Sequence, residues 1–247
     1  MAAMSAVVFA LSWWLGAYLL VRDPRKPVLV LASTGLCGFA VVVALDAVRL
    51  VAHSGLLGQV EIYLAAVPGV AWFAELIELA RPCDSWRART GELLLVGGVA
   101  ALTLIGAVMA GSVDGPLRPG HWVMFGVISL STLGALAKAL VRRAQPVPVV
   151  GLVVLATLFF ALSNAILVIP LGLVPSWLAL ASTGCDVLGL GVAVALWDAF
   201  DEGQALRADM LRSFAATAVV ALLFGGQVLI GLAVTGHGIA LTVLLFT

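Results

Sequence analysis

The sequence is poor in charge. Only 11% of its 247 residues are charged, and 13 Lys and Arg balance 13 Asp and Glu, so the formal net charge is zero. Soluble domains carry about 25% charged residues, and 63% hydrophobic residues would leave a soluble fold with far more apolar surface than water tolerates. The composition therefore excludes a soluble globular domain, and the absence of a basic excess argues against nucleic acid as a partner.

Cysteine and histidine are also rare, with three of each. No two cysteines form a CxxC pair, and a membrane-buried cysteine behaves as a small apolar residue. The histidines lie at or near the ends of apolar runs, so no pair of them could ligate a haem at both depths of a membrane. The sequence also carries no catalytic motif. We therefore predict that these residues form no enzyme and hold no cofactor and no metal.

Long apolar runs are what the chain has instead. About 20 apolar residues cross the hydrocarbon core of a bilayer, and eight runs of that order occur, at residues 3–21, 28–52, 60–80, 92–111, 121–141, 148–173, 176–197 and 213–235. Runs of this length favour helices over barrel strands, because only a helix satisfies its backbone hydrogen bonds within one segment. We predict an all-α polytopic membrane helix bundle, with the lipid bilayer as its main partner.

The loops between the runs indicate the orientation. Eleven of the 13 basic residues lie on one side: Arg22, Arg25, Lys26, Arg81, Arg87, Arg89, Lys138, Arg142, Arg143, Arg207 and Arg212. Only Arg49 and Arg118 lie on the other side. Cytoplasmic loops carry the excess of Lys and Arg, so we predict an outside N-terminus.

Residues 198–212 form neither a span nor a plain loop. Their apolar residues recur at helical spacing with charges on the other face, which predicts an amphipathic helix at the cytoplasmic surface. We therefore divide the chain into a seven-span bundle (1–197), this connector (198–212), and an eighth span with the start of a ninth (213–247). The last apolar run is too short to cross, so we expect the protein to continue beyond it.

Polar residues inside the spans are the candidate functional residues, because each is costly to insert into a membrane. Asp46, Arg49 and His53 share one face near the outer end of the second span, where Asp46 and Arg49 can pair. Glu61, at the start of the third span, would lie opposite. These four residues form either the wall of an outward-open ligand pocket or a stabilising ion pair at the interface.

A second candidate group lies deeper. Asn164 in the sixth span and Asp186 in the seventh fall at similar depth, and the short connection between these spans favours contact between them. A hydrogen bond between the two side chains would serve either as a structural clamp or as part of a site for a ligand, an ion or a proton.

The third span carries two further signals. Pro68 and Gly69 in its middle predict a kink, because proline removes a backbone hydrogen bond. Glu75 and Glu78 share a face near its inner end. Two carboxylates can bind a metal or relay protons, but a metal needs further ligands. Ion pairing with basic residues of the cytoplasmic loops, such as Arg81, is the favoured interpretation.

One stretch carries a family resemblance. Residues 11–27 read LSWWLGAYLLVRDPRKP, in which a span ends in a short basic turn that leads straight into the next span. This stretch, with seven spans and an outside N-terminus, resembles the seven-helix N-terminal transmembrane region of bacterial sensor histidine kinases, over about residues 5–200. The resemblance implies a bacterial inner-membrane location and a cytoplasmic output domain, but no binding residues. The chain differs from the pattern in its eighth span and in having no dimerisation helix, phosphoacceptor histidine or ATP-binding segment.

These observations lead to one functional prediction and two alternatives. We predict a membrane-embedded sensory module, which binds an unknown ligand from outside and relays the signal to the cytoplasm, as a homodimer or with other membrane subunits. A small-molecule or ion transporter component is the first alternative, and a structural subunit of a membrane complex is the second. A retinal protein is excluded because the only lysines, Lys26 and Lys138, lie outside the seventh span.

Overall fold

The computed structural model describes residues 2–22, 24–52, 55–79 and 86–142, with six single positions between 178 and 219. Its helices are α1 (Ala2–Arg22), α2 (Pro27–Ala52), α3 (Gly55–Leu64), α4 (Ala66–Leu79), α5 (Trp86–Ala110) and α6 (Pro119–Arg142), and these described ranges contain no strand. The predicted all-α fold is therefore confirmed for this part of the chain.

Five stretches are long and apolar enough to cross a membrane: Met4–Val21, Pro27–Arg49, Gly55–Glu78, Arg89–Ala110 and Pro119–Lys138. They coincide with the first five predicted spans and fit an integral membrane protein. The predicted sixth span and the predicted connector at 198–212 lie outside the described residues, and only single positions of the predicted seventh and eighth spans are described.

Pro68 explains why the third span consists of two helices. Without an N–H group, Pro68 cannot donate to the carbonyl of Leu64, and its ring crowds that carbonyl. The helix is accordingly interrupted at Ala65, whose own N–H still donates to the Glu61 carbonyl at 2.9 Å. The predicted interruption is present, but it lies three residues before the proline.

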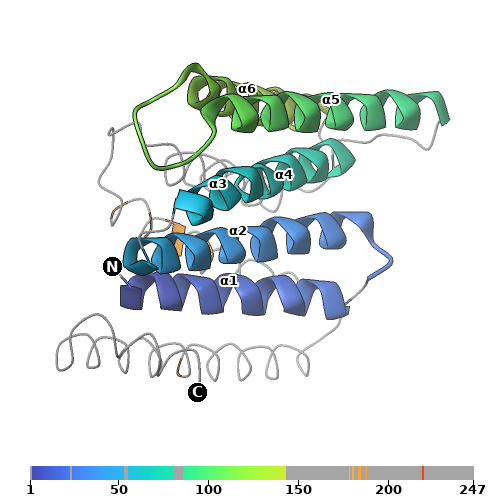
Figure 1. Ribbon diagram of the computed structural model, residues 1–247. Coiled ribbons are helices and arrows are strands. Elements are labelled where there is room, and N and C mark those ends of the chain that lie inside the picture. The colour runs from blue at the N-terminus through green and yellow to red at the C-terminus, as the bar shows by residue number, and fades with distance from the viewer. Residues whose placement is uncertain are drawn as a thin grey trace.

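The spans pack as neighbours that alternate in direction (Figure 1). Helix α1 packs on α2, α2 packs on α4, and α4 packs on both α5 and α6. Close approach depends on small residues at the crossings. A Cβ atom at Gly35 would lie only 2.7 Å from the Trp72 Nε1 atom, so α2 and α4 can come this close only because residue 35 is glycine.

Two apolar clusters fill the space between α2 and the last described helices. One lies toward the end where α3 begins and contains Val42, Ile62, Ala65, Ala107, Ala110, Val113 and Met124. The other joins α4 to α6 and contains Phe73, Leu76, Ile77 and Ala135. The surface of α5 that faces away from these clusters is largely exposed and apolar, for example at Leu94 and Val108, as expected for a face that meets lipid.

Candidate functional site

A charged cluster lies at the end of the bundle where α2 ends and α3 begins. The Arg49 guanidinium, in the last turn of α2, contacts three carboxylates. Its Nε donates to Glu61 Oε2 at 2.7 Å, its Nη2 donates to Asp46 Oδ1 at 2.6 Å, and its Nη1 donates to Asp114 Oδ1. We call these four residues the Arg49 cluster. Because Asp46 belongs to α2, Glu61 to α3 and Asp114 to the α5–α6 loop, one side chain joins three elements.

The carboxylates of the Arg49 cluster differ in exposure. The side chain of Glu61 is 1% exposed, that of Asp46 20% and that of Asp114 47%. The second oxygen of Glu61, Oε1, is buried and has no hydrogen-bond partner among the described residues. Three carboxylates and one guanidinium leave two negative charges in excess when all are ionised. By exposure, the Glu61–Arg49 pair is the buried centre of the cluster, and the Asp114–Arg49 pair is the part that water reaches.

Local helix geometry places the first three members. Asp46 and Arg49 are three residues apart, so their side chains lie on one face of α2. A cation in the last turn of a helix also interacts favourably with the helix dipole. Glu61 lies on the buried face of α3, together with Gly58 and Ile62. This face of α3 turns Glu61 toward the end of α2.

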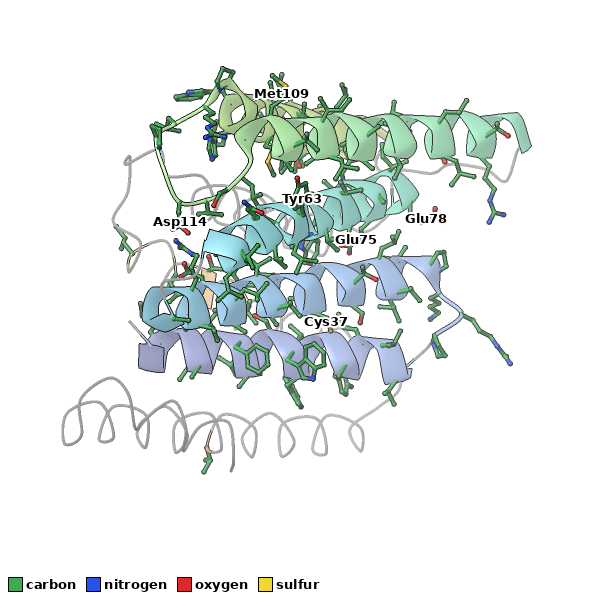
Figure 2. The ribbon with its side chains drawn as sticks, viewed as in Figure 1. Cys37, Tyr63, Glu75, Glu78, Met109 and Asp114 are labelled. Atoms are coloured by element: carbon green, nitrogen blue, oxygen red, sulfur yellow. The ribbon has the colours of Figure 1, made fainter. Side chains whose placement is uncertain are left out.

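Gly58 determines where the α5–α6 loop, residues 111–118, meets α3. The Val113 N–H donates to the Gly58 carbonyl at 3.2 Å. A Cβ atom at position 58 would lie 2.6 Å from Ser112 Oγ and would also collide with Asp114 Oδ2. The Asp114 N–H in turn donates to Ser112 Oγ at 3.2 Å. The missing side chain at Gly58 thus lets the loop approach closely enough for Asp114 to reach Arg49, and Figure 2 shows Asp114 at this end of the bundle.

His121, in the first turn of α6, braces the same loop from its other side. Its ring is buried, its Nδ1 accepts the Arg118 N–H at 3.0 Å, and its Nε2 lies 3.1 Å from the Ser112 carbonyl. Because Nδ1 accepts a hydrogen bond, the ring proton belongs on Nε2, which donates to Ser112. At the start of the loop, Gly111 ends α5 with a φ of 77°, a conformation that glycine adopts without strain. The loop that carries Asp114 is therefore held at both ends.

No protein-family model, curated protein or solved structure matches this chain. Any functional proposal must therefore rest on the geometry of the site.

The structure brings together three of the six predicted site residues. The predicted Asp46–Arg49 pair is confirmed, and Glu61 lies opposite, as expected, in direct contact with Arg49. Whether these residues bind a ligand stays a prediction. The other three predicted site residues, His53, Asn164 and Asp186, lie outside the described residues.

Sequence reasoning missed Asp114. An acidic residue in a loop is usually solvated, and its partner here depends on the backbone contact between the loop and Gly58. One signal was available: Asp114 follows the fourth predicted span, on the same predicted side of the membrane as Arg49.

Of the two carboxylates of α4, Glu75 differs from expectation within the described residues. Glu75 is 4% exposed, and its Oε2 has no hydrogen-bond partner among the described residues. The predicted ion pair with a basic loop is therefore absent at Glu75 within the described part, while Arg81 lies outside it. The residues that the structure describes contain no group of His, Cys, Asp and Glu arranged to hold a metal ion.

Proposed function

We propose that this chain is a sensory module of a multi-pass membrane protein, which binds a ligand from the outside at the Arg49 cluster and relays the signal to the cytoplasm. The observation that carries the proposal is the position of Arg49, whose guanidinium contacts carboxylates of α2, α3 and the α5–α6 loop. A single charged side chain thus contacts all three elements at one end of the bundle.

This arrangement supplies what a sensor needs. A ligand shifts a conformational equilibrium only through different affinities for two states. A ligand that pairs with Arg49, or with the carboxylates around it, can bind only by replacing the bonds between Arg49 and those carboxylates. Because α2 spans from Arg49 to Pro27, a shift at its outer end is passed along a rigid helix to its inner end.

The proposal includes an orientation and a larger architecture. The basic turn that contains Arg25 and Lys26, and the inner end of α6 with Lys138, lie at the ends of their helices opposite to the Arg49 cluster. The positive-inside rule then places the Arg49 cluster and the N-terminus outside. The proposed protein has seven or more spans in a bacterial inner membrane, and its output domain belongs to the cytoplasm, as in the sensor kinases that the sequence resembles.

A transporter is the second candidate, because the third span is broken. Helices interrupted within the membrane are typical of transporters, where they line the substrate site. The interruption at Ala65, followed by Pro68, is of this kind. A structural subunit would instead use the Arg49 cluster only to stabilise the fold.

Electron–electron distance measurements between spin labels on the full chain in lipid nanodiscs test the sensor. With the native cysteines replaced, labels at Pro27→Cys and Ala137→Cys report the separation of the inner ends of α2 and α6, where both positions are exposed. We expect Arg49→Gln to shift this distance distribution. The control is Arg118→Gln, because Arg118 is the other outer arginine and, among the described residues, its guanidinium hydrogen-bonds only to the Ala110 carbonyl, at 3.4 Å. An unchanged distribution in Arg49→Gln would contradict the sensor and favour a structural subunit.

The same variant separates the sensor from the transporter. A transporter must open a water-filled path to the middle of the membrane, whereas a sensor needs only a helix displacement. A cysteine at Ala66, beside the interruption, becomes reactive toward a membrane-impermeant maleimide from the inner side only if such a path opens. Reaction in Arg49→Gln would favour the transporter.

A further inference from the structure

Glu75 is a buried carboxyl group that the Arg49 cluster does not use. It lies on α4, its exposed fraction is 4%, and its Oε2 has no hydrogen-bond partner among the described residues. Fourteen residues separate Glu75 from Glu61, which corresponds to about 21 Å of helix at 1.5 Å per residue. Figure 2 shows Glu75 on the part of α4 that leads away from the Arg49 cluster. Glu75 is therefore a separate feature, within the candidate span Gly55–Glu78.

Among the described residues, the helices packed against α4 offer Glu75 no compensating charge. Their titratable side chains in the described part are Cys37, Asp46 and Arg49 on α2, Glu61 and Tyr63 on α3, Arg89 and Glu92 on α5, and His121 and Lys138 on α6, with Glu78 on α4 itself. Arg49 is bound within its own cluster, and Lys138 is bound by Glu92 at 3.3 Å. None of the described cations pairs with Glu75.

The part of α2 that lies at the level of Glu75 carries no charged residue. Trp72, one turn before Glu75, meets α2 at Gly35. Since α2 and α4 run in opposite directions, Glu75 falls at about the level of Ala32 on α2, three residues before Gly35. The polar residues beside Ala32 are Ser33 and Thr34, which carry no charge. An ionised carboxylate that is removed from water without a paired cation is strongly disfavoured, and such a group takes up a proton instead.

We propose that Glu75 is an intramembrane proton-binding site. It holds a proton while α2 and α4 are packed together, and it releases that proton to water when their interface opens. Proton uptake and helix packing are then linked, so acid favours the packed state and alkali favours the open state. This inference does not depend on the function proposed for the Arg49 cluster.

A hydrophobic carbodiimide, dicyclohexylcarbodiimide, tests the proposal directly on the full chain in nanodiscs. The reagent reacts with protonated carboxyl groups in apolar surroundings: the carboxyl proton moves to one carbodiimide nitrogen and a carboxyl oxygen bonds to the central carbon. The acyl group then migrates to nitrogen, which gives a stable adduct that retains every atom of the reagent. Mass spectrometry of peptides locates this adduct.

We expect the wild-type adduct at Glu75, its loss in Glu75→Gln, and its retention in the control Glu78→Gln, which removes the neighbouring, less buried carboxyl group. Arg49→Gln should also retain it, so that a failure of the sensor proposal leaves this result standing. Absence of the adduct from folded wild-type protein would overturn the proposal, and so would equal labelling by a water-soluble carbodiimide.

Infrared spectroscopy gives a second test that needs no labelling. A protonated carboxyl group has a C=O stretching band that shifts in deuterated water. This band should be present in the wild type and absent in Glu75→Gln, and it should fade as the pH is raised. Its presence at equal strength in both proteins would assign the proton to another residue and contradict the proposal.

Discussion

Removal of Arg49 should destabilise the bundle more than removal of any single carboxylate that it binds. In the wild type the side chain of Glu61 is 1% exposed, and Arg49 is the one cation that contacts it among the described residues. Arg49→Gln removes this partner. Removing one partner of a buried ion pair costs about 3–5 kcal/mol, because the remaining carboxylate must either stay charged without a partner or take up a proton. Asp114, at 47% exposure, instead forms a surface-type pair, and Asp114→Asn should cost about 0–1 kcal/mol.

A second substitution distinguishes the cost of leaving Glu61 without a cation from the cost of losing the contact between the two side chains. Arg49→Gln with Glu61→Gln leaves two neutral amides that can bond to each other, so neither position 49 nor position 61 leaves a buried charge. We expect the double variant to recover at least half of the free energy lost in Arg49→Gln alone. A non-additive result is expected because Arg49 Nε and Glu61 Oε2 are in direct contact, 2.7 Å apart.

Reversible unfolding in mixed micelles, by titration with sodium dodecyl sulfate, measures these differences. Tryptophan fluorescence can follow the transition, since the chain has seven tryptophans. The reasoning would be refuted if Arg49→Gln cost no more than Asp114→Asn, or if the double variant lost as much as the sum of its single variants.

Three further substitutions test the packing of the α5–α6 loop and of the α2–α4 contact. Gly58→Ala should cost about 1–3 kcal/mol by overpacking the loop, whereas the control Gly55→Ala on the same helix, with nothing within 4 Å, should cost nothing; equal effects on unfolding would contradict the close approach. His121→Ala should cost about 1–3 kcal/mol through two lost hydrogen bonds, measured by the same titration, and a neutral result would exclude the bracing role. Gly35→Ala should displace Trp72 and shift its fluorescence, and an unaltered spectrum would argue against the α2–α4 contact.

The fold was predictable from the sequence where it depends on length and periodicity. Runs of about 20 apolar residues gave the first five spans, and a spacing of three residues gave the Asp46–Arg49 pair. The proline predicted a broken third span, but the interruption falls at Ala65, because the missing bond belongs to a carbonyl four residues before the proline.

The parts that could not be predicted depend on contacts between distant segments. Asp114 reaches Arg49 only because Gly58 admits the loop, and no local pattern links positions 58 and 114. Glu75 was expected to pair with a basic loop, and its lack of a cation partner among the described residues follows from the way α4 packs among α2, α5 and α6. A single sequence fixes neither the rotation of a helix nor the path of a loop.

Hydrogen–deuterium exchange in Arg49→Gln tests most directly the central claim that Arg49 holds three elements together. If it does, exchange should speed up both in α3 and in residues 111–118, segments that are separate in sequence, while the middle of α5 keeps the wild-type rate. Arg118→Gln serves as the control and should leave α3 unchanged. Wild-type exchange in both α3 and the loop of Arg49→Gln would contradict the account.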